Sequence, residues 1–237
     1  MNSRYAPWIF SSVLFLTGAI ITAQLFWHVS REESNTLHAS FQTSSDIATN
    51  NNQSRLDRYA LVMRGLKGFY EGSAQISFQE FHDYVNTLQL KDKSGLQALG
   101  LVTFIPYGEK ARHIAELRQQ GADNYQLKPE GQREFYAPIT RLEPAIGSNL
   151  VALGFDTWTV PAARQALEQA RDQGTLAITS RLKLIQDTGE SNMASFVMYL
   201  PIYRKNVPVD TVDARRAAIL GWVDAPFHLD ELMNELR

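Results

Sequence analysis

The sequence predicts an α+β protein in which an N-terminal transmembrane helix and a long stalk helix precede a domain of mixed helices and strands. A long apolar run without charges lies near the N-terminus, and apolar residues recur with a helical period after it. The rest of the chain mixes helical and alternating patterns without a repeated strand-helix-strand unit, so we expect antiparallel strand pairs.

The composition excludes several classes of protein. Hydrophobic residues make up 44% of the 237-residue chain and charged residues 20%, which are ordinary values for a globular protein. The net charge is −2, and Lys and Arg are spread along the chain, so no nucleic-acid partner is expected. The chain has no cysteine, which excludes disulfides, thiolate zinc sites and thiol nucleophiles.

Residues 1–30 are predicted to form a short cytoplasmic start and a membrane anchor. The chain carries no formal charge from Trp8 to Trp27, and a run of roughly 20 helical residues matches a hydrocarbon core of about 30 Å. Arg4 favours a cytoplasmic N-terminus, and tryptophans at both ends suit the membrane interfaces. The alternative is a signal peptide cleaved after Ala23, but the apolar run continues beyond that site. Both interpretations export the remainder of the chain.

Residues 31–75 are predicted to form the stalk. A helix over residues 34–69 would be roughly 50 Å long, too long for one small lobe to cover, so part of it should stand free and pair with a second copy. A long core helix is the alternative, and the polar stretch 42–54 counts against it. The residues that set the helical period are Leu37, Phe41, Ala48, Leu56, Tyr59, Met63, Leu66 and Tyr70.

The first half of the exported part contains two predicted helices and two predicted strands. Ser77 and Glu80 have the spacing of a capping box and open the first helix. The apolar residues 98–105 indicate a buried strand, residues 109–120 an amphipathic helix, and residues 135–142 a second strand.

The second half begins with a predicted helix that runs through Pro161 to Arg171 and ends before Gly174. Residues 176–186 alternate as in a strand, with Thr179, Lys183 and Ile185 on one face. Residues 194–203 and 217–223 are further predicted strands, and residues 227–237 form a closing helix.

The sequence offers no convincing catalytic apparatus. Ser180 and Lys183 match a Ser-x-x-Lys pattern, but residues three apart in an alternating strand point to opposite faces. We therefore expect a chain that is not an enzyme and has no metal or other cofactor. The five histidines are too far apart in the sequence to share a helical face: His28, His38, His82, His113 and His228.

A set of ordered motifs does carry a specific signal over about residues 60–236: Leu153-Gly154-Phe155-Asp156, Pro161, Ala170-Arg171-Asp172-Gln173-Gly174, Thr179, Leu184-Ile185-Gln186 and Leu200-Pro201-Ile202-Tyr203. These motifs resemble the CHASE domain, the extracytoplasmic sensing module of membrane histidine kinases and nucleotide cyclases, including the cytokinin receptors of plants. The resemblance implies a stalk helix followed by two PAS-like lobes of mixed or antiparallel sheet, with a small ligand in the membrane-distal lobe and a homodimeric assembly.

The resemblance also implies positions for a ligand pocket. The aspartate that takes the adenine nitrogens in cytokinin receptors corresponds to Ala163, so the ligand should not be an adenine-type cytokinin. Ile185 and Tyr199 correspond to two other pocket positions, although Tyr199 could equally be an ordinary core aromatic, and Thr179 corresponds to a position important for binding. Lys183 shares the predicted strand face, which favours an anionic or strongly hydrogen-bonding ligand.

Together these features predict the input region of a receptor in the bacterial inner membrane, with a periplasmic sensory domain over residues 76–226. Residues 227–237 would lead back toward the membrane. We expect the output, a histidine kinase of a two-component system or a diguanylate cyclase or phosphodiesterase, to lie outside this chain. A periplasmic hydrolase and a structural, dimerising membrane protein are the alternatives.

Overall fold

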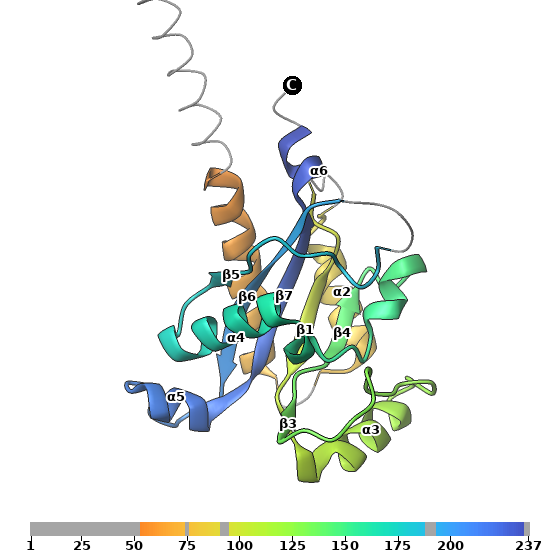
Figure 1. Cartoon of the computed structure of the whole chain (residues 1–237), viewed down its shortest axis with the longest axis vertical. Helices are drawn as coiled ribbons and strands as arrows, with labels where there is room; N and C mark the ends of the chain where they lie inside the picture. The colour runs from red at the N-terminus through yellow and green to blue at the C-terminus, as the bar shows by residue number, and fades with distance from the viewer. Residues whose placement is uncertain (1–52, 74–75, 91–94, 188–192, 235–237) are drawn as a thin grey trace, which may run out of the picture. The chain divides into compact units, whose positions relative to one another are not determined.

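The computed structural model describes residues 53–73, 76–90, 95–187 and 193–234 (Figure 1). The predicted membrane segment and most of the predicted stalk lie outside these residues. None of the helices in the described ranges is both long and apolar enough to cross a membrane.

A five-stranded antiparallel sheet forms the centre of the fold, with strand order β4-β1-β7-β6-β5 (Figure 1). A separate two-stranded ribbon joins β2 to β3. This arrangement confirms the α+β class with an antiparallel sheet, whereas the division into two PAS-like lobes stays a prediction. The strands are β1 (Leu99–Thr103), β2 (Ile105–Pro106), β3 (Phe135–Tyr136), β4 (Ile139–Glu143), β5 (Ala177–Ile178), β6 (Ser195–Tyr203) and β7 (Ile219–His228).

Helices cover both faces of the sheet. Residues 53–72 are helical, and the other helices are α2 (Phe78–Thr87), α3 (Lys110–Gln119), α4 (Pro161–Gln173), α5 (Val212–Ala218) and α6 (Leu229–Asn234). Short 3-10 turns are η1 (Tyr107–Glu109), η2 (Gly147–Ala152) and η3 (Thr157–Thr159).

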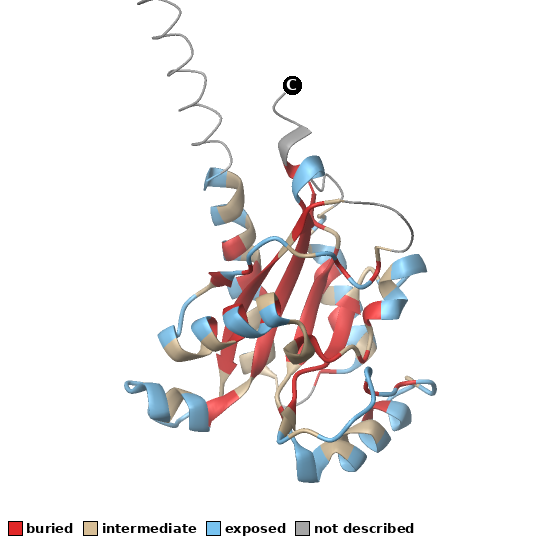
Figure 2. Ribbon diagram, viewed as in Figure 1, coloured by how far each residue is buried: buried red, intermediate tan, exposed pale blue. Residues whose placement is uncertain are grey.

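The two faces of the sheet build two separate apolar clusters. On one face, Met63 of helix 53–72 and Phe81 of α2 pack in a cluster with Val223 of β7. On the other face, Leu167 of α4 packs in a cluster with Trp222 of the same strand. Because successive side chains of a strand point to opposite faces, β7 serves both clusters. Figure 2 shows the buried strands in the middle and exposed residues on the outer surfaces of the helices.

The start of α2 confirms the capping box expected from the sequence. The Ser77 side chain accepts a hydrogen bond from the Glu80 N–H at 3.1 Å, and the Glu80 carboxylate accepts one from the Ser77 N–H at 2.8 Å. These bonds satisfy two backbone donors that have no partner within the helix.

Ser77→Ala should lower the free energy of unfolding by about 1 kcal/mol, because it removes one side of the capping box. Urea unfolding of the variant and of the unchanged chain measures this difference. Ser180→Ala replaces an exposed serine that lies in neither a helix nor a strand, and should change stability by less than about 0.5 kcal/mol. Equal effects of the two substitutions would contradict the assigned role of Ser77.

The predicted strand over residues 176–186 is wrong in its length, because only Ala177 and Ile178 join the ladder. At the next position, the Thr179 hydroxyl accepts the Val197 N–H at 3.0 Å. In a continuing strand, a backbone carbonyl would accept this N–H of β6. Here the Thr179 hydroxyl accepts it instead. The segment then leaves the sheet and returns only as an isolated bridge between Leu182 and Ser195.

The C-terminal part also differs from the sequence prediction. Residues 212–218, whose last two were placed in a strand, form helix α5, which Thr211 caps by accepting the Ala214 N–H. Strand β7 then extends to His228, so the closing helix begins at Leu229 rather than at residue 227.

Candidate ligand-binding site

A cavity of about 50 Å³ lies under α4, between that helix, the sheet and the segment 182–187. Four of the five residues predicted to bind a ligand line it: Ala163, Lys183, Ile185 and Tyr199. The fifth, Thr179, is buried but does not line the cavity, and its hydroxyl is bonded to β6. The structure thus brings together residues of α4, β6 and the segment after β5.

Helix α4 covers the cavity, and local features of the sequence define its two ends and its buried face. Pro161 fits the first turn, and Gly174 ends the helix with a left-handed φ of 73°. The buried face includes the small residues Ala163 and Ala166, which let the helix lie close to the sheet. The Trp222 Nε1–H donates to the Leu167 carbonyl at 3.2 Å and fastens the helix to β7.

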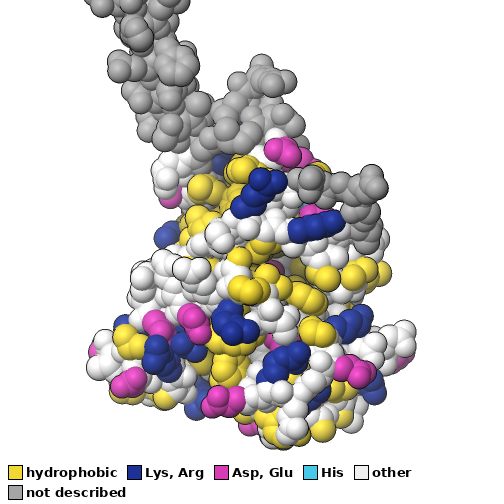
Figure 3. Space-filling view, in the orientation of Figure 1, with side chains coloured by type: hydrophobic (Ala, Val, Ile, Leu, Met, Phe, Trp, Pro, Cys, Tyr) yellow, Lys and Arg dark blue, Asp and Glu magenta, His cyan; other side chains and the backbone are white. Residues whose placement is uncertain are grey.

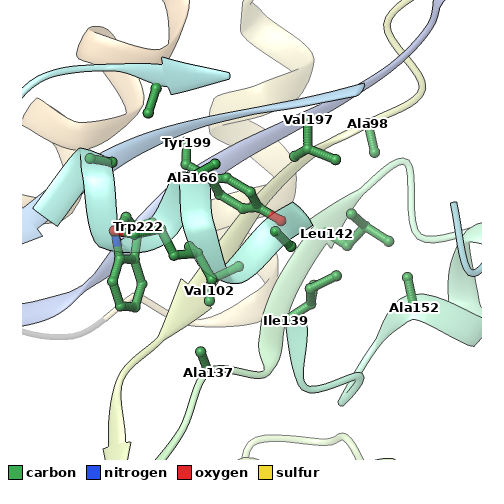
Figure 4. Close-up of a cluster of buried hydrophobic side chains, with 14 of the residues drawn as sticks. Ala98, Val102, Ala137, Ile139, Leu142, Ala152, Ala166, Val197, Tyr199 and Trp222 are labelled. Atoms are coloured by element: carbon green, nitrogen blue, oxygen red, sulfur yellow. The ribbon is translucent and has the colours of Figure 1, made fainter. Parts of the chain in front are cut away.

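Tyr199 of β6 and Trp222 of β7 reach into the layer beneath α4, close to Ala166 (Figure 4). Complete burial, and to a smaller extent the nearby Asp224, raise the pKa of Tyr199 well above its usual value. Its phenol is therefore neutral, and Tyr199 lines the cavity.

The entry into α4 depends on a buried acid in the motif Leu153-Gly154-Phe155-Asp156. The Asp156 Oδ1 accepts the Ala137 N–H at 2.9 Å and the Trp158 N–H at 3.2 Å. Burial raises the pKa of Asp156, and these hydrogen bonds and Arg133, whose Nη1 is 3.5 Å from the carboxylate, partly offset that effect. The motif therefore positions the chain in front of α4 and does not line the cavity with its acid.

Asp224 is the functional candidate that the sequence analysis missed. It lines the cavity from the middle of β7 and is 3% exposed, and among the described residues its Oδ1 has no hydrogen-bond partner. Gly100 is paired with it on β1, and a Cβ at that position would collide with Oδ1. Glycine on the neighbouring strand therefore leaves room for the carboxyl group.

The electrostatic surroundings of Asp224 are unusual for an acid. Burial raises its pKa to about 7, because a charged carboxylate loses its hydration in this position. Tyr199, its register partner on β6, carries a neutral phenol. A buried polar atom without a partner is costly, so a ligand that donates a hydrogen bond to Oδ1 would gain free energy here. The signal in the sequence was a single acid within the otherwise apolar run 219–227.

The mouth of the cavity is formed by the segment after Thr179. Lys183 and Ile185 are exposed and Leu184 and Gln186 are buried, whereas Thr179, which was predicted on the same face as Lys183 and Ile185, is buried. The segment ends at Asp187, whose Oδ1 lies 3.0 Å from the His228 Nε2. The His228 Nδ1 lies 3.2 Å from the Glu231 carboxylate in α6. A chain of polar contacts therefore connects the cavity mouth to α6.

The lining of the cavity combines polar and apolar groups. A buried carboxyl, a neutral phenol and apolar walls can hold and orient a small molecule. Within the described ranges, no group of three possible metal ligands comes together. In the space-filling view, hydrophobic side chains gather across the middle of the face that carries α4, with Lys and Arg side chains among them (Figure 3).

Comparison with known proteins gives a family match and a match to a solved structure of low sequence identity. A family model described as "CHASE domain" matches residues 74–237. The ligand-binding domain of the Pseudomonas aeruginosa PAO1 amino acid chemoreceptor PctC, in complex with GABA, is 13% identical in sequence, with a TM-score of 0.43. That match covers 80% of this chain and 59% of the chemoreceptor chain.

Proposed function

The chain belongs to the CHASE domain family of extracytoplasmic sensory modules, and we propose that it is the input region of a transmembrane receptor whose ligand binds beneath α4. The observation that carries this proposal is the buried Asp224, with an Oδ1 that has no partner in the described structure, beside four residues expected to line the pocket. The domain senses rather than catalyses.

The ligand is a small molecule that presents an N–H or ammonium group to Asp224. A carboxyl group with a pKa of about 7 can accept from such a donor, and a positive charge would favour its ionised form. Helix α4 carries Ala163 in place of an acid, so the carboxyl group that meets the ligand is that of Asp224, on the opposite wall of the cavity. The ligand is therefore not an adenine-type cytokinin.

Binding moves the segment 182–187. The cavity has a volume of about 50 Å³, whereas most ligand pockets have roughly 300–1,000 Å³. The cavity must therefore enlarge when the ligand binds, and the exposed Lys183 and Ile185 move outward. This movement displaces Asp187, and its contact with His228 transmits the displacement to Glu231 at the start of α6. The ligand thereby shifts the population of two arrangements of the C-terminal segment.

The wider architecture follows the same proposal. Residues 1–30 anchor the chain in the inner membrane, residues 31–75 form a stalk that pairs with a second copy, and residues 76–226 sense the ligand in the periplasm as two PAS-like lobes. Residues 227–237 return toward the membrane and a histidine kinase, diguanylate cyclase or phosphodiesterase output.

A thermal-shift screen of small amines, amides and amino acids on the purified 237-residue chain tests the site. A compound at one hundred times its Kd should stabilise the chain by about 2.7 kcal/mol. Ala163→Val should weaken this binding at least tenfold, because its two extra methyl groups occupy the cavity under α4.

Ala162→Val is the matched control, since it makes the same change on the same helix at a residue outside the cavity lining. It should leave the affinity within twofold of that of the unchanged chain. A compound that binds the Ala163 variant and the unchanged chain equally well would place the site elsewhere.

A further inference from the structure

A larger groove, of about 720 Å³, lies on the face of the sheet that carries helix 53–72. It is bounded by the end of that helix, by β1 and β4, and by α3. Leu101 of β1 and Leu117 of α3 give it a buried apolar wall. None of the residues lining the cavity under α4 lines this groove, so the two sites are separate.

Arg141 of β4 lies in the groove lining and is only 6% exposed. Its Nη1 donates to the Thr140 carbonyl at 2.9 Å. Its Nη2 donates to the Ile76 carbonyl at 2.9 Å and to the Gln120 Oε1 at 2.5 Å. The Nε–H has no acceptor among the described residues. The guanidinium also stacks on Phe78, with 3.9 Å between Cζ and the ring centroid.

The charge of Arg141 is not balanced by an acid in the described structure, because none of the ion pairs there includes it. Its described hydrogen-bond acceptors are two carbonyls and an amide, all neutral. Burial of a cation without a counter-ion is costly, and an anion that reaches it would recover that cost.

The remaining polar groups of the lining also favour an anion. Arg204 and Lys205 line the groove, and the lining carboxylate of Glu71 is 3.7 Å from Lys67. Burial and the nearby Arg141 lower the pKa of His113 to about 4, so its imidazole is neutral at pH 7. The positive charge in the groove therefore comes from arginine and lysine side chains and not from His113.

We propose that this groove is a second binding site, which takes a small organic monocarboxylate with an apolar or aromatic body. The carboxylate binds the Nε–H of Arg141 and displaces the Gln120 amide from Nη2, which gives the paired contact that guanidinium and carboxylate groups form. The apolar body lies along Leu101 and Leu117.

A monocarboxylate fits the site better than phosphate. Arg141 lies beside the apolar wall of Leu101 and Leu117, so a monocarboxylate with an apolar body can use both the charge and the wall, whereas inorganic phosphate has no apolar part to contact the leucines. The groove also has room for far more than an inorganic ion, because one water in the liquid occupies about 30 Å³.

Benzoate, titrated into the full 237-residue chain at constant ionic strength and followed by NMR, tests the proposal. The His113 ring signals should shift with saturation, since His113 lines the groove, while those of His228 should not. Inorganic phosphate at the same concentration should leave the His113 signals in place.

Arg141→Met should weaken benzoate binding at least tenfold, because it keeps a long side chain but removes the cation. Asp224→Asn, in the other site, should leave benzoate affinity within twofold. A benzoate affinity unchanged in Arg141→Met, an equal response to phosphate, or no shift of His113 in the unchanged chain would each overturn the proposal. The His113 measurement needs no variant, so it decides the matter even where Arg141→Met fails to fold.

Discussion

Asp224→Asn should stabilise the folded chain at pH 8 by about 2–4 kcal/mol and change its stability by less than about 1 kcal/mol at pH 4.5. The reason is the pKa of the Asp224 carboxyl, which burial raises from 3.8 to about 7. Well below pH 3.8 the carboxyl is protonated in both the folded and the unfolded chain, so ionisation costs nothing. As the pH rises from about 4 to above 7, the unfolded chain releases this proton first and the folded state loses stability.

Asparagine has nearly the shape of a protonated aspartate and cannot ionise, so the variant does not lose stability as the pH rises through this range. Urea unfolding of Asp224→Asn and of the unchanged chain at pH 4.5 and pH 8 measures the difference in their free energies of unfolding. Taking this difference cancels the contributions of the other titrating groups. Asp123→Asn, at an exposed position, should change stability by less than about 0.5 kcal/mol at either pH. A stabilisation by Asp224→Asn of equal size at pH 4.5 and pH 8 would contradict the assignment.

Gly154→Ala should destabilise the chain by about 2–4 kcal/mol. Gly154 has a φ of 80°, which an alanine adopts only with strain, and an added Cβ would collide with the Gln126 carbonyl oxygen. The collision is with the backbone, so no side-chain rotation relieves it. Asp156 follows two residues later, and its bonds to Ala137 and Trp158 would be displaced with it.

Thermal unfolding of Gly154→Ala compared with Gly108→Ala measures this effect. A Cβ at Gly108 would meet no atom within 4 Å, so that substitution should cost less than about 0.5 kcal/mol. If Gly154→Ala were as mild as Gly108→Ala, the motif would not have the structural role that we assign to it.

Features encoded by a few neighbouring residues could be predicted from the sequence. The capping box at Ser77 and Glu80, and the proline and glycine that begin and end α4, need only local hydrogen bonds and backbone conformation. The pocket residues Ala163 and Tyr199 came from the family resemblance, and the fold brings them to one cavity because α4 packs against β6.

Features that depend on distant partners could not be predicted. The alternation over 176–186 indicated one strand, but the Thr179 hydroxyl takes the Val197 N–H and ends the ladder, which depends on how β6 lies. The predicted strand 217–223 ended one residue before Asp224. The burial of Asp224 could not be predicted, because it depends on Gly100 of the neighbouring strand β1 and on α4 above the sheet. Arg141 likewise carries no local sign that its guanidinium is buried without an acid.

The most direct test of the account follows the carboxyl carbon signal of Asp224 by NMR as the pH is varied, with and without a compound that stabilises the chain. Without the compound, the carboxyl should titrate with a pKa of about 7. The compound should lower that pKa by at least one unit, because a donor placed against the carboxyl favours its ionised form. A titration curve that the compound leaves unchanged would contradict the claim that the ligand binds Asp224 beneath α4.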